Sequence, residues 1–366
     1  MIIPGLVDLH THAPQYAFRG MGMDLELLEW LYKYTFPEES RYESLEYAEK
    51  AYPLYVEDLR KSFTTRAVIF STIHRESALF LVDQLEKTGL ITCVGKVNMD
   101  RNAPEYYIEK TENSLRETER FIRETRNYKR TKAILTPRFI PTCTDELMRG
   151  LSGIQKESGL GLQSHLSENR NEIQWVKELC PDAEFYGDAY DRFGLFGGKC
   201  KTVMAHCVLS GEDETQLMRE RGVYIAHCPS SNMNLSSGIA PIRKFITQGV
   251  KVGLGTDLAA GHSMSIVDEM ICAVQASKMR WRYVSDEEPI NILDAFYMAT
   301  RGGGEFFGKV GSFDKGYEFD ALVIDDSKSR SSIAPDDRSR FLRSLYLHHE
   351  CSLRAKYVCG KKIDIS

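Results

Sequence analysis

Two histidines one residue apart, His10 and His12, end an apolar run that begins at Ile2. On a β-strand, residues i and i+2 point to the same side, so both imidazoles would project from one face at the carboxyl end of the strand. Such a pair places two nitrogen ligands on one metal ion. A single histidine at a strand end is more often a structural residue, so the pair alone leaves both interpretations open.

Three further polar residues, His165, His206 and Asp257, stand at the ends of predicted strands. In a barrel of parallel strands, the carboxyl ends converge on one site. Neutral imidazoles together with a carboxylate suit a divalent ion such as zinc or ferrous iron. A site with few protein ligands leaves a position for water, and the metal lowers the pKa of that water towards neutrality. The whole set therefore indicates a catalytic metal site, which no member indicates by itself.

Glu168 follows His165 by three residues, in Ser164-His165-Leu166-Ser167-Glu168-Asn169. A carboxylate just past a metal ligand can reach the activated water and carry its proton to a leaving group. The alternative is a glutamate in the first turn of a helix, where the helix dipole favours negative charge. We expect the catalytic role because of the neighbouring residues.

Arg138 ends the fourth predicted strand, in Thr136-Pro137-Arg138-Phe139. No lysine stands there, which disfavours two metal ions bridged by a carboxylated lysine, so one metal ion is expected. A guanidinium group could instead bind a planar, oxygen-bearing heterocycle through directional hydrogen bonds. Gln15, just beyond the histidine pair, could contact the donor and acceptor edge of the same ring. The alternative for Arg138 is a salt bridge at the rim of the barrel.

The remaining histidines are weaker candidates. His227, at the end of the seventh strand, is expected in the pocket wall or behind the ligands, and His74 in a loop or at the pocket edge. Ordinary surface positions are expected for His262, His348 and His349. An aromatic cluster is expected to pack in the core, with one or two members lining a pocket for a flat ring: Trp30, Tyr32, Tyr34 and Phe36.

The composition describes a globular protein with 366 residues, 42% of them hydrophobic, which suffices for one large barrel or two domains. A net charge of -5 argues against a general nucleic-acid binder. The nine cysteines form no CxxC motif and are expected to be reduced thiols of a cytoplasmic protein. No signal peptide and no apolar run near the ~20 residues needed to span a bilayer are visible, so no membrane partner is expected.

Strand-like runs alternate with helical patterns over most of the chain. Strands are expected at residues 2–12, 66–72, 90–97, 132–139, 160–166, 202–206, 223–227 and 250–255. Helices are expected at 45–62, 77–87, 111–126, 144–158, 169–179, 212–221, 242–248, 265–277 and 291–300. Eight strands, each followed by a helix, predict an α/β fold, a (β/α)8 TIM barrel over residues 1–308. A doubly wound open sheet is the alternative, but it would not bring these strand ends around one point.

The alternating pattern of strands and helices ends after residue 308. A turn and strand are expected over 316–325, a polar loop over 328–340 and a hairpin over 355–363. These elements predict a small, incomplete β-sandwich domain at residues 309–366.

The chain resembles the deaminases of the amidohydrolase superfamily, and among them the guanine deaminase family most closely. The stretches that carry the resemblance span nearly the whole length: Pro4-Gly5-Leu6-Val7-Asp8 to His12, Ala13-Pro14-Gln15-Tyr16, Leu27-Leu28-Glu29-Trp30-Leu31, Lys33-Tyr34-Thr35-Phe36-Pro37, Thr136-Pro137-Arg138-Phe139, Ser164 to Asn169, Met204-Ala205-His206, Ala226-His227-Cys228-Pro229 and Gly253-Leu254-Gly255-Thr256-Asp257.

The resemblance implies one zinc ion, or iron in its place, bound by His10, His12, His165 and Asp257. It implies that His206 orients the hydroxide, that Asp257 is also the general base, and that Glu168 transfers protons to a ring nitrogen and the departing amine. The residues that would contact the purine are Gln15, Arg138, Phe139 and His165. The implied reaction converts guanine and water into xanthine and ammonia.

Two features leave alternatives open. Family members usually carry several strands before the histidine pair, so we expect either a truncated sequence or C-terminal strands with exposed edges. A homodimer is also open, since such enzymes often form dimers, although the sequence shows no interface signal. Competing functions are deamination or dechlorination of another amino-heterocycle (pterin, cytosine, triazine or an adenosine-type compound) and a scaffold without activity, which should lack the metal ligands.

Overall fold

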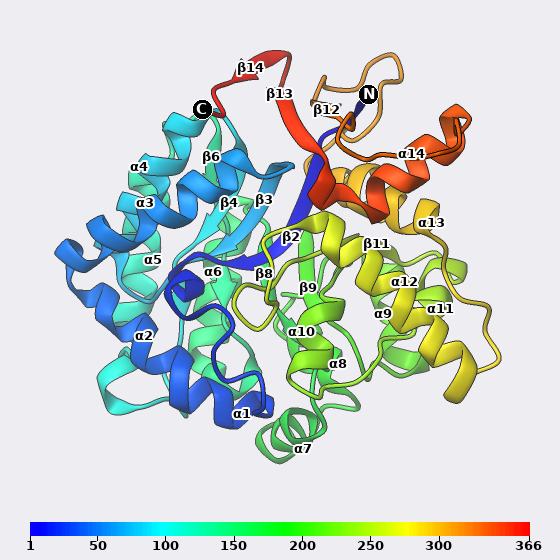
Figure 1. Ribbon diagram of the computed structural model, residues 1–366. Coiled ribbons are helices and arrows are strands. Elements are labelled where there is room, and N and C mark those ends of the chain that lie inside the picture. The colour runs from blue at the N-terminus through cyan, green and yellow to red at the C-terminus, as the bar shows by residue number, and fades with distance from the viewer.

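Eight parallel strands form the centre of the protein. The computed structural model describes residues 1–366 (Figure 1). One half of the barrel contains β2 (Leu6–His12), β3 (Thr64–Phe70), β4 (Ile91–Gly95) and β6 (Thr131–Ala133), and the other contains β8 (Leu162–Leu166), β9 (Thr202–His206), β10 (Tyr224–His227) and β11 (Lys251–Leu254). Each half is hydrogen-bonded in chain order. The predicted (β/α)8 TIM barrel is confirmed.

The barrel closes through two short contacts between its halves. A parallel bridge pairs Leu135 with Leu162 on one side. On the other side, the backbone N–H of Asp257 donates to the carbonyl of His10 at 2.8 Å. The third and fourth strands are each interrupted, and their continuations β5 (Val97–Asn98) and β7 (Thr136–Pro137) pair with one another. The hydrogen bond between Asp257 and His10 therefore brings one predicted metal ligand against β2, the strand that carries His10 and His12.

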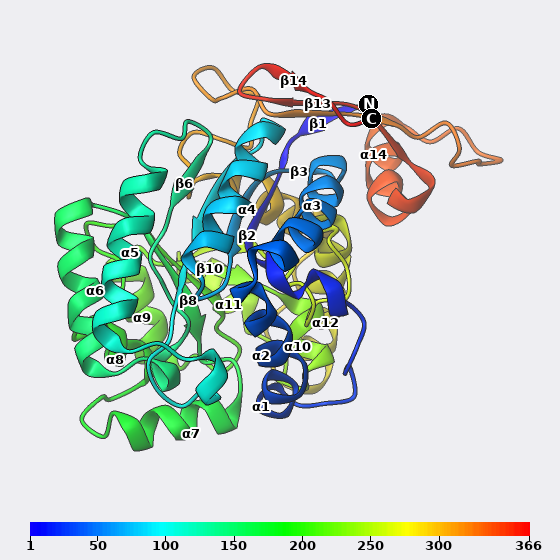
Figure 2. The ribbon, with the colours of Figure 1, turned by 90° about the vertical axis from the view of Figure 1, so that its left-hand side faces the viewer.

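Helices surround the barrel, as Figures 1 and 2 show. They are α3 (Leu45–Lys61), α4 (Arg75–Thr88), α5 (Thr111–Thr125), α6 (Asp145–Ser158), α7 (Arg170–Leu179), α8 (Tyr186–Asp191), α9 (Glu212–Arg221), α10 (Pro229–Asn234), α11 (Ile242–Thr247), α12 (Ile266–Tyr283) and α13 (Ile292–Tyr297). Most agree with the expected helices because local signals define their ends. Thr144 and Asn169 cap α6 and α7 through their side chains, and Gly89 ends α4 at φ 82°.

Residues 13–44 form a chain of short helical segments that the sequence did not predict. They are η1 (Ala13–Phe18), α1 (Leu27–Trp30), η2 (Leu31–Thr35), α2 (Phe36–Ser40) and η3 (Arg41–Glu43). In Figure 2, α1 and α7 lie at one end of the barrel, to which the carboxyl end of β2 points. This segment therefore lies over the end of the barrel where the predicted site residues converge.

A four-stranded antiparallel sheet lies at the opposite end of the barrel (Figure 2). Its order is β1 (Ile2–Pro4), β12 (Ala321–Asp325), β13 (Ser352–Val358) and β14 (Lys361–Ile363). The expected single strand over residues 2–12 is therefore wrong, because it divides at Gly5 between the small sheet and the barrel. A Cβ at Gly5 would lie 2.4 Å from the side chain of Thr65, so a side chain there would prevent this close passage.

The pairing of β1 with β12 also corrects the expectation that the C-terminal strands lack partners. Ile2, Ile3 and Pro4 pair with Val323, Leu322 and Ala321. The buried guanidinium of Arg66 on β3 joins the sheet to the barrel, with Nε 2.7 Å from Asp320 and Nη2 2.8 Å from Glu318. The small sheet is thus attached to the barrel by charge pairs as well as by the continuous chain.

One helix replaces part of an expected loop. The polar stretch 328–340 leads into α14 (Asp337–Tyr346), where the side chain of Asp336 caps the first turn. The apolar residues that hold α14 in place lie in its later turns, beyond the predicted loop: Phe341, Leu342 and Leu345. No helix of the protein combines the length and apolar character needed to cross a bilayer.

Candidate active site

Four side chains bring their ligand atoms together at the carboxyl ends of the strands. His10 Nε2 lies 3.2 Å from His12 Nε2, and His12 Nε2 lies 3.4 Å from His165 Nε2. Asp257 Oδ1 lies 3.2 Å from His10 Nε2 and 3.3 Å from His12 Nε2. Ligands about 2.0–2.1 Å from a tetrahedral ion are ~3.3 Å apart, so this spacing fits a zinc-sized divalent ion.

Hydrogen bonds from behind fix the direction of these ligands. His165 Nδ1 donates to the backbone carbonyl of Arg138 at 2.6 Å, which leaves Nε2 free to face the cluster. Ser231 Oγ donates to Asp257 Oδ2 at 2.5 Å. The Nδ1 atom of His12 is buried without any partner, although its Nε2 faces the other ligands. These contacts present imidazole lone pairs and a carboxylate oxygen to one point.

His206 lies at the edge of this cluster. Its Nδ1 donates to Asn232 Oδ1 at 2.9 Å, while its Nε2 lies 3.5 Å from Glu168 Oε2 and 3.7 Å from Asp257 Oδ2. It also forms a possible metal-binding group with His10 and His165. His206 therefore lies between the ligand cluster and the glutamate predicted to transfer protons.

The backbone at two of these positions is left-handed, a conformation that non-glycine residues seldom adopt. The φ angle is 74° at His206 and 45° at Asp257. Each such residue costs of order 1–3 kcal/mol and persists only where the surrounding structure fixes it. Gly255 allows the approach of this segment to β2, because a Cβ there would lie 2.8 Å from the Cβ of His10. The strained backbone turns both side chains towards the cluster.

Burial controls the charges of the ligands. Burial lowers the pKa of His10, and burial together with the neighbouring charge of His10 lowers the pKa values of His12 and His165 well below the usual range. These imidazoles are therefore neutral near pH 7, the form that binds metal ions. Burial opposes the charge on Asp257, but the interactions with His10, His206 and His12 together outweigh burial and hold the pKa of Asp257 well below its usual range.

Glu168 faces the pocket from the loop before α7. Its Oε1 accepts from Ser237 Oγ at 3.1 Å. Burial, followed by the negative charge of Asp257, raises the pKa of Glu168 to about 8. The glutamate that caps α7 is Glu172, whose Oε2 accepts from the backbone N–H groups of Glu168 and Asn169 at 2.9 and 3.2 Å. The position in the first turn of the helix, which was the alternative for Glu168, therefore belongs to Glu172.

A narrow pocket opens beside the ligand cluster. It is lined by every predicted site residue except His10: His12, Gln15, Arg138, Phe139, His165, Glu168, His206 and Asp257. Its free volume is about 30 Å³, close to the space for one water. Leu27, Trp30 and Leu31 of α1 and η2 form an apolar wall. Trp30 is thus the member of the aromatic cluster that lines the pocket.

Glu39 on α2 is the important residue that the sequence did not indicate. Its fully buried carboxylate accepts hydrogen bonds from Gln15 and Arg138, the two residues predicted to bind the substrate. In the sequence it stands in Pro37-Glu38-Glu39-Ser40, which is typical of an exposed helix turn. The aromatic residues Tyr34 and Phe36 just before it were the only local signal of burial.

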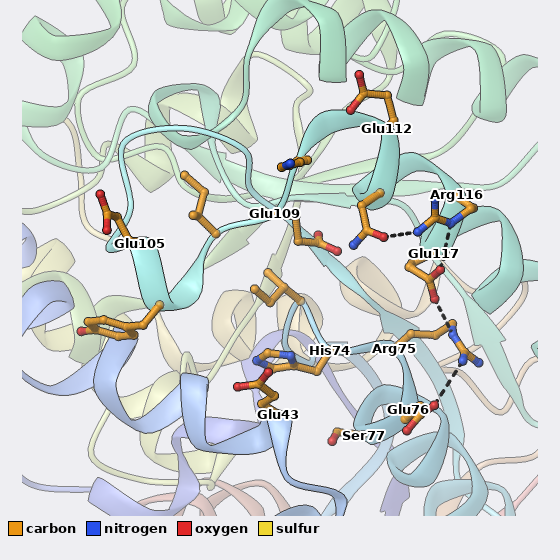
Figure 3. A pocket seen from close by; sticks show the side chains of 15 residues that line it. Glu43, His74, Arg75, Glu76, Ser77, Glu105, Glu109, Glu112, Arg116 and Glu117 are labelled. Carbon is orange, nitrogen blue, oxygen red and sulfur yellow. Dashed lines mark hydrogen bonds and ion pairs between the residues drawn. The ribbon is translucent and has the colours of Figure 1, made fainter.

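The other histidines lie outside the ligand cluster. His227 is buried with an unpartnered Nδ1 and does not line the pocket, and burial lowers its pKa to about 3. His74 lines a separate open groove of about 890 Å³. Figure 3 shows this groove, where Arg75 and Arg116 lie against Glu117 at 2.8 and 3.3 Å. His262 and His349 are exposed, and His348 pairs with Asp268 at 3.0 Å.

The site thus combines a set of metal-type ligands, a carboxyl group beside them and a pocket with amide and guanidinium groups. Comparison with known proteins agrees with this arrangement. The profile of the amidohydrolase family matches residues 1–345, and the chain belongs to this family, whose members are metal-dependent hydrolases.

Guanine deaminases stand among its most similar relatives. The chain is 44% identical to the guanine deaminase of Mus musculus, with 99% of this chain and 82% of that protein covered. The crystal structure of guanine deaminase from C. acetobutylicum with bound guanine in the active site has a TM-score of 0.96 and 46% identity, covering 99% of this chain and 87% of that one. The E. coli guanine deaminase structure has a TM-score of 0.91 and 33% identity, covering 99% and 84%.

Proposed function

We propose that this chain is an enzyme that hydrolyses guanine to xanthine and ammonia. One observation carries the proposal: three residues of the ligand cluster (His12, His165 and Asp257), Glu168 and the substrate-binding candidates Gln15 and Arg138 line one pocket. Water adds its oxygen to the amine-bearing carbon of the ring, and the bond from that carbon to the amine breaks. One proton of the water goes to the departing amine and the other to the ring nitrogen. The similarity to guanine deaminases of a mammal and of bacteria supports the same reaction.

A single zinc ion is the proposed cofactor. His10, His12, His165 and Asp257 would hold it, since the imidazoles are neutral and four of the distances between their ligand atoms are 3.2–3.4 Å. When bound, such an ion supplies a Lewis acid that lowers the pKa of water. Iron is the alternative, because imidazole and carboxylate ligands suit both ions.

The proton transfers are assigned to three residues. Asp257 Oδ2, held by Ser231, accepts a proton from the attacking water as general base. His206 Nε2 orients that water, because its other nitrogen is fixed on Asn232. Glu168 donates a proton to the ring nitrogen and then transfers one to the amine. Its carboxyl group lies 3.5 Å from His206, and both residues line the pocket, so a molecule bound there can contact both.

The rest of the pocket would hold the purine. Arg138 and Gln15 supply hydrogen bonds to its polar edge, and Phe139 supplies an apolar surface against the ring. His165 borders the same space and would contact the ring as well as the metal.

Two further properties are proposed, a cytoplasmic location and a homodimer. All nine cysteines are free, which is the usual state in the reducing cytoplasm and supports a cytoplasmic location. A homodimer is proposed from the resemblance to enzymes that often form dimers, and sedimentation of the purified protein would test it. The proposed substrate is a small purine, with neither a nucleic-acid nor a membrane partner.

The testing experiment measures ammonia release from guanine, adenine, cytosine and a triazine, on protein whose metal content is determined. We expect selective turnover of guanine with about one metal ion per chain. Metal without guanine turnover would contradict the proposed substrate and direct attention to another amino-heterocycle. Protein without metal or turnover would contradict the catalytic assignment altogether.

A further inference from the structure

Glu39 occupies an unusual position for a carboxylate with no direct place in the proposed reaction. It is completely buried on α2, yet it receives four hydrogen bonds from three separate parts of the chain. Gln15 Nε2 donates at 2.9 Å, Arg138 Nη1 and Nη2 at 2.5 and 3.2 Å, and Tyr107 Oη at 2.8 Å. Two of the donors, Gln15 and Arg138, line the pocket, whereas Glu39 itself does not.

The pair of bonds from Arg138 fixes the plane of its guanidinium group. A guanidinium group whose two terminal nitrogens both donate to one carboxylate has little freedom to rotate. The ring of Phe36 lies 5.3 Å from the guanidinium carbon and supports it from one side. Both partners are almost without exposure, 0% for Glu39 and 2% for Arg138, so neither charge has water as an alternative partner. The remaining N–H groups of Arg138 are left for a ligand.

The carboxylate of Glu39 also fixes the orientation of the Gln15 side-chain amide. The Nε2 group donates to Glu39, while Oε1 accepts from the backbone N–H of Ala259 at 3.2 Å. A flipped amide would place its oxygen against the carboxylate and its N–H₂ group against an N–H, which is unfavourable at both ends. One N–H of Gln15 therefore remains, together with the N–H groups of Arg138, as a set of donors.

We propose that Glu39 is a positioning residue that holds Gln15 and Arg138 as a fixed set of donors and so selects purines with an oxygen at C6. This inference rests on the proposed function. The oxo group at C6 and the ring nitrogen N7 on the same edge both accept hydrogen bonds, whereas an amino group at C6 presents N–H groups to the donors. Removing the carboxylate should release both side chains and weaken this selection, while the reacting groups stay in place.

Tyr107 extends the same network towards the open groove. Its hydroxyl donates to Glu39, and its ring lies 5.8 Å from the ring of His74, one of the residues in Figure 3. Tyr107 contacts neither Gln15 nor Arg138 through an assigned hydrogen bond. A substitution here therefore perturbs Glu39 alone and leaves its ion pair with Arg138 intact.

The test compares Glu39→Gln with the unaltered, metal-loaded enzyme. We expect the KM for guanine to rise about 10–100-fold with kcat nearly unchanged, because the lost contacts orient the substrate. Hypoxanthine and adenine, which differ at C6, are then measured as competitive inhibitors. The unaltered enzyme should prefer hypoxanthine, and Glu39→Gln should narrow the ratio of their inhibition constants. A general structural defect would not narrow this ratio.

Two further variants complete the test. Glu38→Gln is the matched control, since the neighbouring carboxylate bonds to Arg41 and Tyr47 instead, and all constants should stay within about twofold. Tyr107→Phe leaves no buried charge unpaired and should raise the KM by severalfold, so it carries the test if Glu39→Gln does not fold. Unaltered enzyme without guanine turnover would overturn the proposed function and this inference together. Guanine turnover with an unchanged KM and inhibitor ratio in the folded variants would overturn the role of Glu39 alone.

Discussion

The pocket beside the ligand cluster and the open groove in Figure 3 differ in size and in how their carboxylates are held. The groove has a free volume of about 890 Å³ against about 30 Å³ for the pocket. Its lining contains more carboxylates: Glu43, Glu76, Glu105, Glu109, Glu112 and Glu117. The pocket and the groups behind it contain fewer carboxylates, but those of Glu168, Asp257 and Glu39 are all buried.

The partners of these carboxylates explain the difference. In the groove, Glu76 is largely exposed, and Arg75 is shared between Glu76, Glu117 and Glu124. Such pairs are weakened by water and salt and contribute little to stability. In the pocket, each carboxylate accepts from fixed donors away from water, where electrostatic interactions are stronger. Burial and fixed partners, rather than the size of a hollow, identify the region equipped for chemistry.

The largest effect is expected from a substitution in the ligand cluster, because it should remove the bound metal. His12→Ala removes one imidazole from the ligand cluster, so we predict loss of bound metal and no detectable deaminase activity. Metal analysis and ammonia release measure both results. His262→Ala is the control, because this exposed histidine lies outside the cluster. A His12→Ala protein that kept stoichiometric metal would contradict the assigned ligand set.

Glu168→Gln should have the next largest effect. The substitution keeps the shape of the side chain but removes the proton transfer, so we predict about 10²–10⁴-fold lower kcat with the metal retained. Steady-state kinetics and metal analysis on the same preparation check this prediction. Glu178→Gln, on the exposed face of α7, should have neither effect. Near-normal turnover in Glu168→Gln would remove Glu168 from its catalytic role.

Lys356, a buried lysine outside the pocket, tests whether burial alone can shift the pKa of a side chain. Lys356 on β13 donates to the backbone carbonyls of Arg60 and Thr64 at 2.7 and 2.9 Å, and burial lowers its pKa from 10.5 to about 7. Between these two values the unfolded chain binds more protons than the folded protein, so the contribution of Lys356 to stability should rise with pH.

Urea unfolding from pH 6 to 10 measures this contribution as the difference between the unaltered protein and Lys356→Met. We predict that the difference in the free energy of unfolding increases above pH 7 by at most about 1.4 kcal/mol per pH unit. No such slope from this residue is expected below pH 7, where both states are protonated. Parallel pH profiles for the two proteins would show that the burial of Lys356 does not shift its pKa.

The smallest effect is expected in the groove. Glu117→Gln breaks the pairs with Arg75, which is partly buried, and with Arg116 and Arg120, which are exposed. We predict less than about twofold change in guanine turnover and a loss of stability of no more than about 1 kcal/mol, smaller still at high salt. A large loss of turnover would mean that the groove takes part in the reaction, and the contrast between the two regions would fail.

The sequence predicted those parts of the fold and site whose signals are local. Helix ends such as Thr144, Asn169 and Gly89 are defined by residues within one turn, and the strand-end residues follow from the barrel pattern. The structure brings together the predicted ligands, Glu168, Gln15 and Arg138 because the barrel converges these strand ends. Their chemical roles remain predictions until the variants are measured.

The parts that the sequence did not predict depend on distant contacts. Glu39 has the local surroundings of a surface glutamate, and its burial is determined by Arg138, 99 residues later. The division of the first strand at Gly5 depends on the pairing of Ile2 with Val323. The short helices between residues 13 and 44 lack a regular apolar period because they wrap over the barrel instead of packing along it.

The pairing of β1 with β12 also has a consequence for how the protein is made. Ile2 cannot pair with Val323 until more than three hundred further residues have been synthesised. The barrel itself cannot close on His10 before Asp257 has emerged. Parallel strands joined over such distances assemble slowly, and their apolar edges stay open meanwhile. The proposed metal site is therefore complete only after Asp257 has been synthesised, and the small sheet only after Val323.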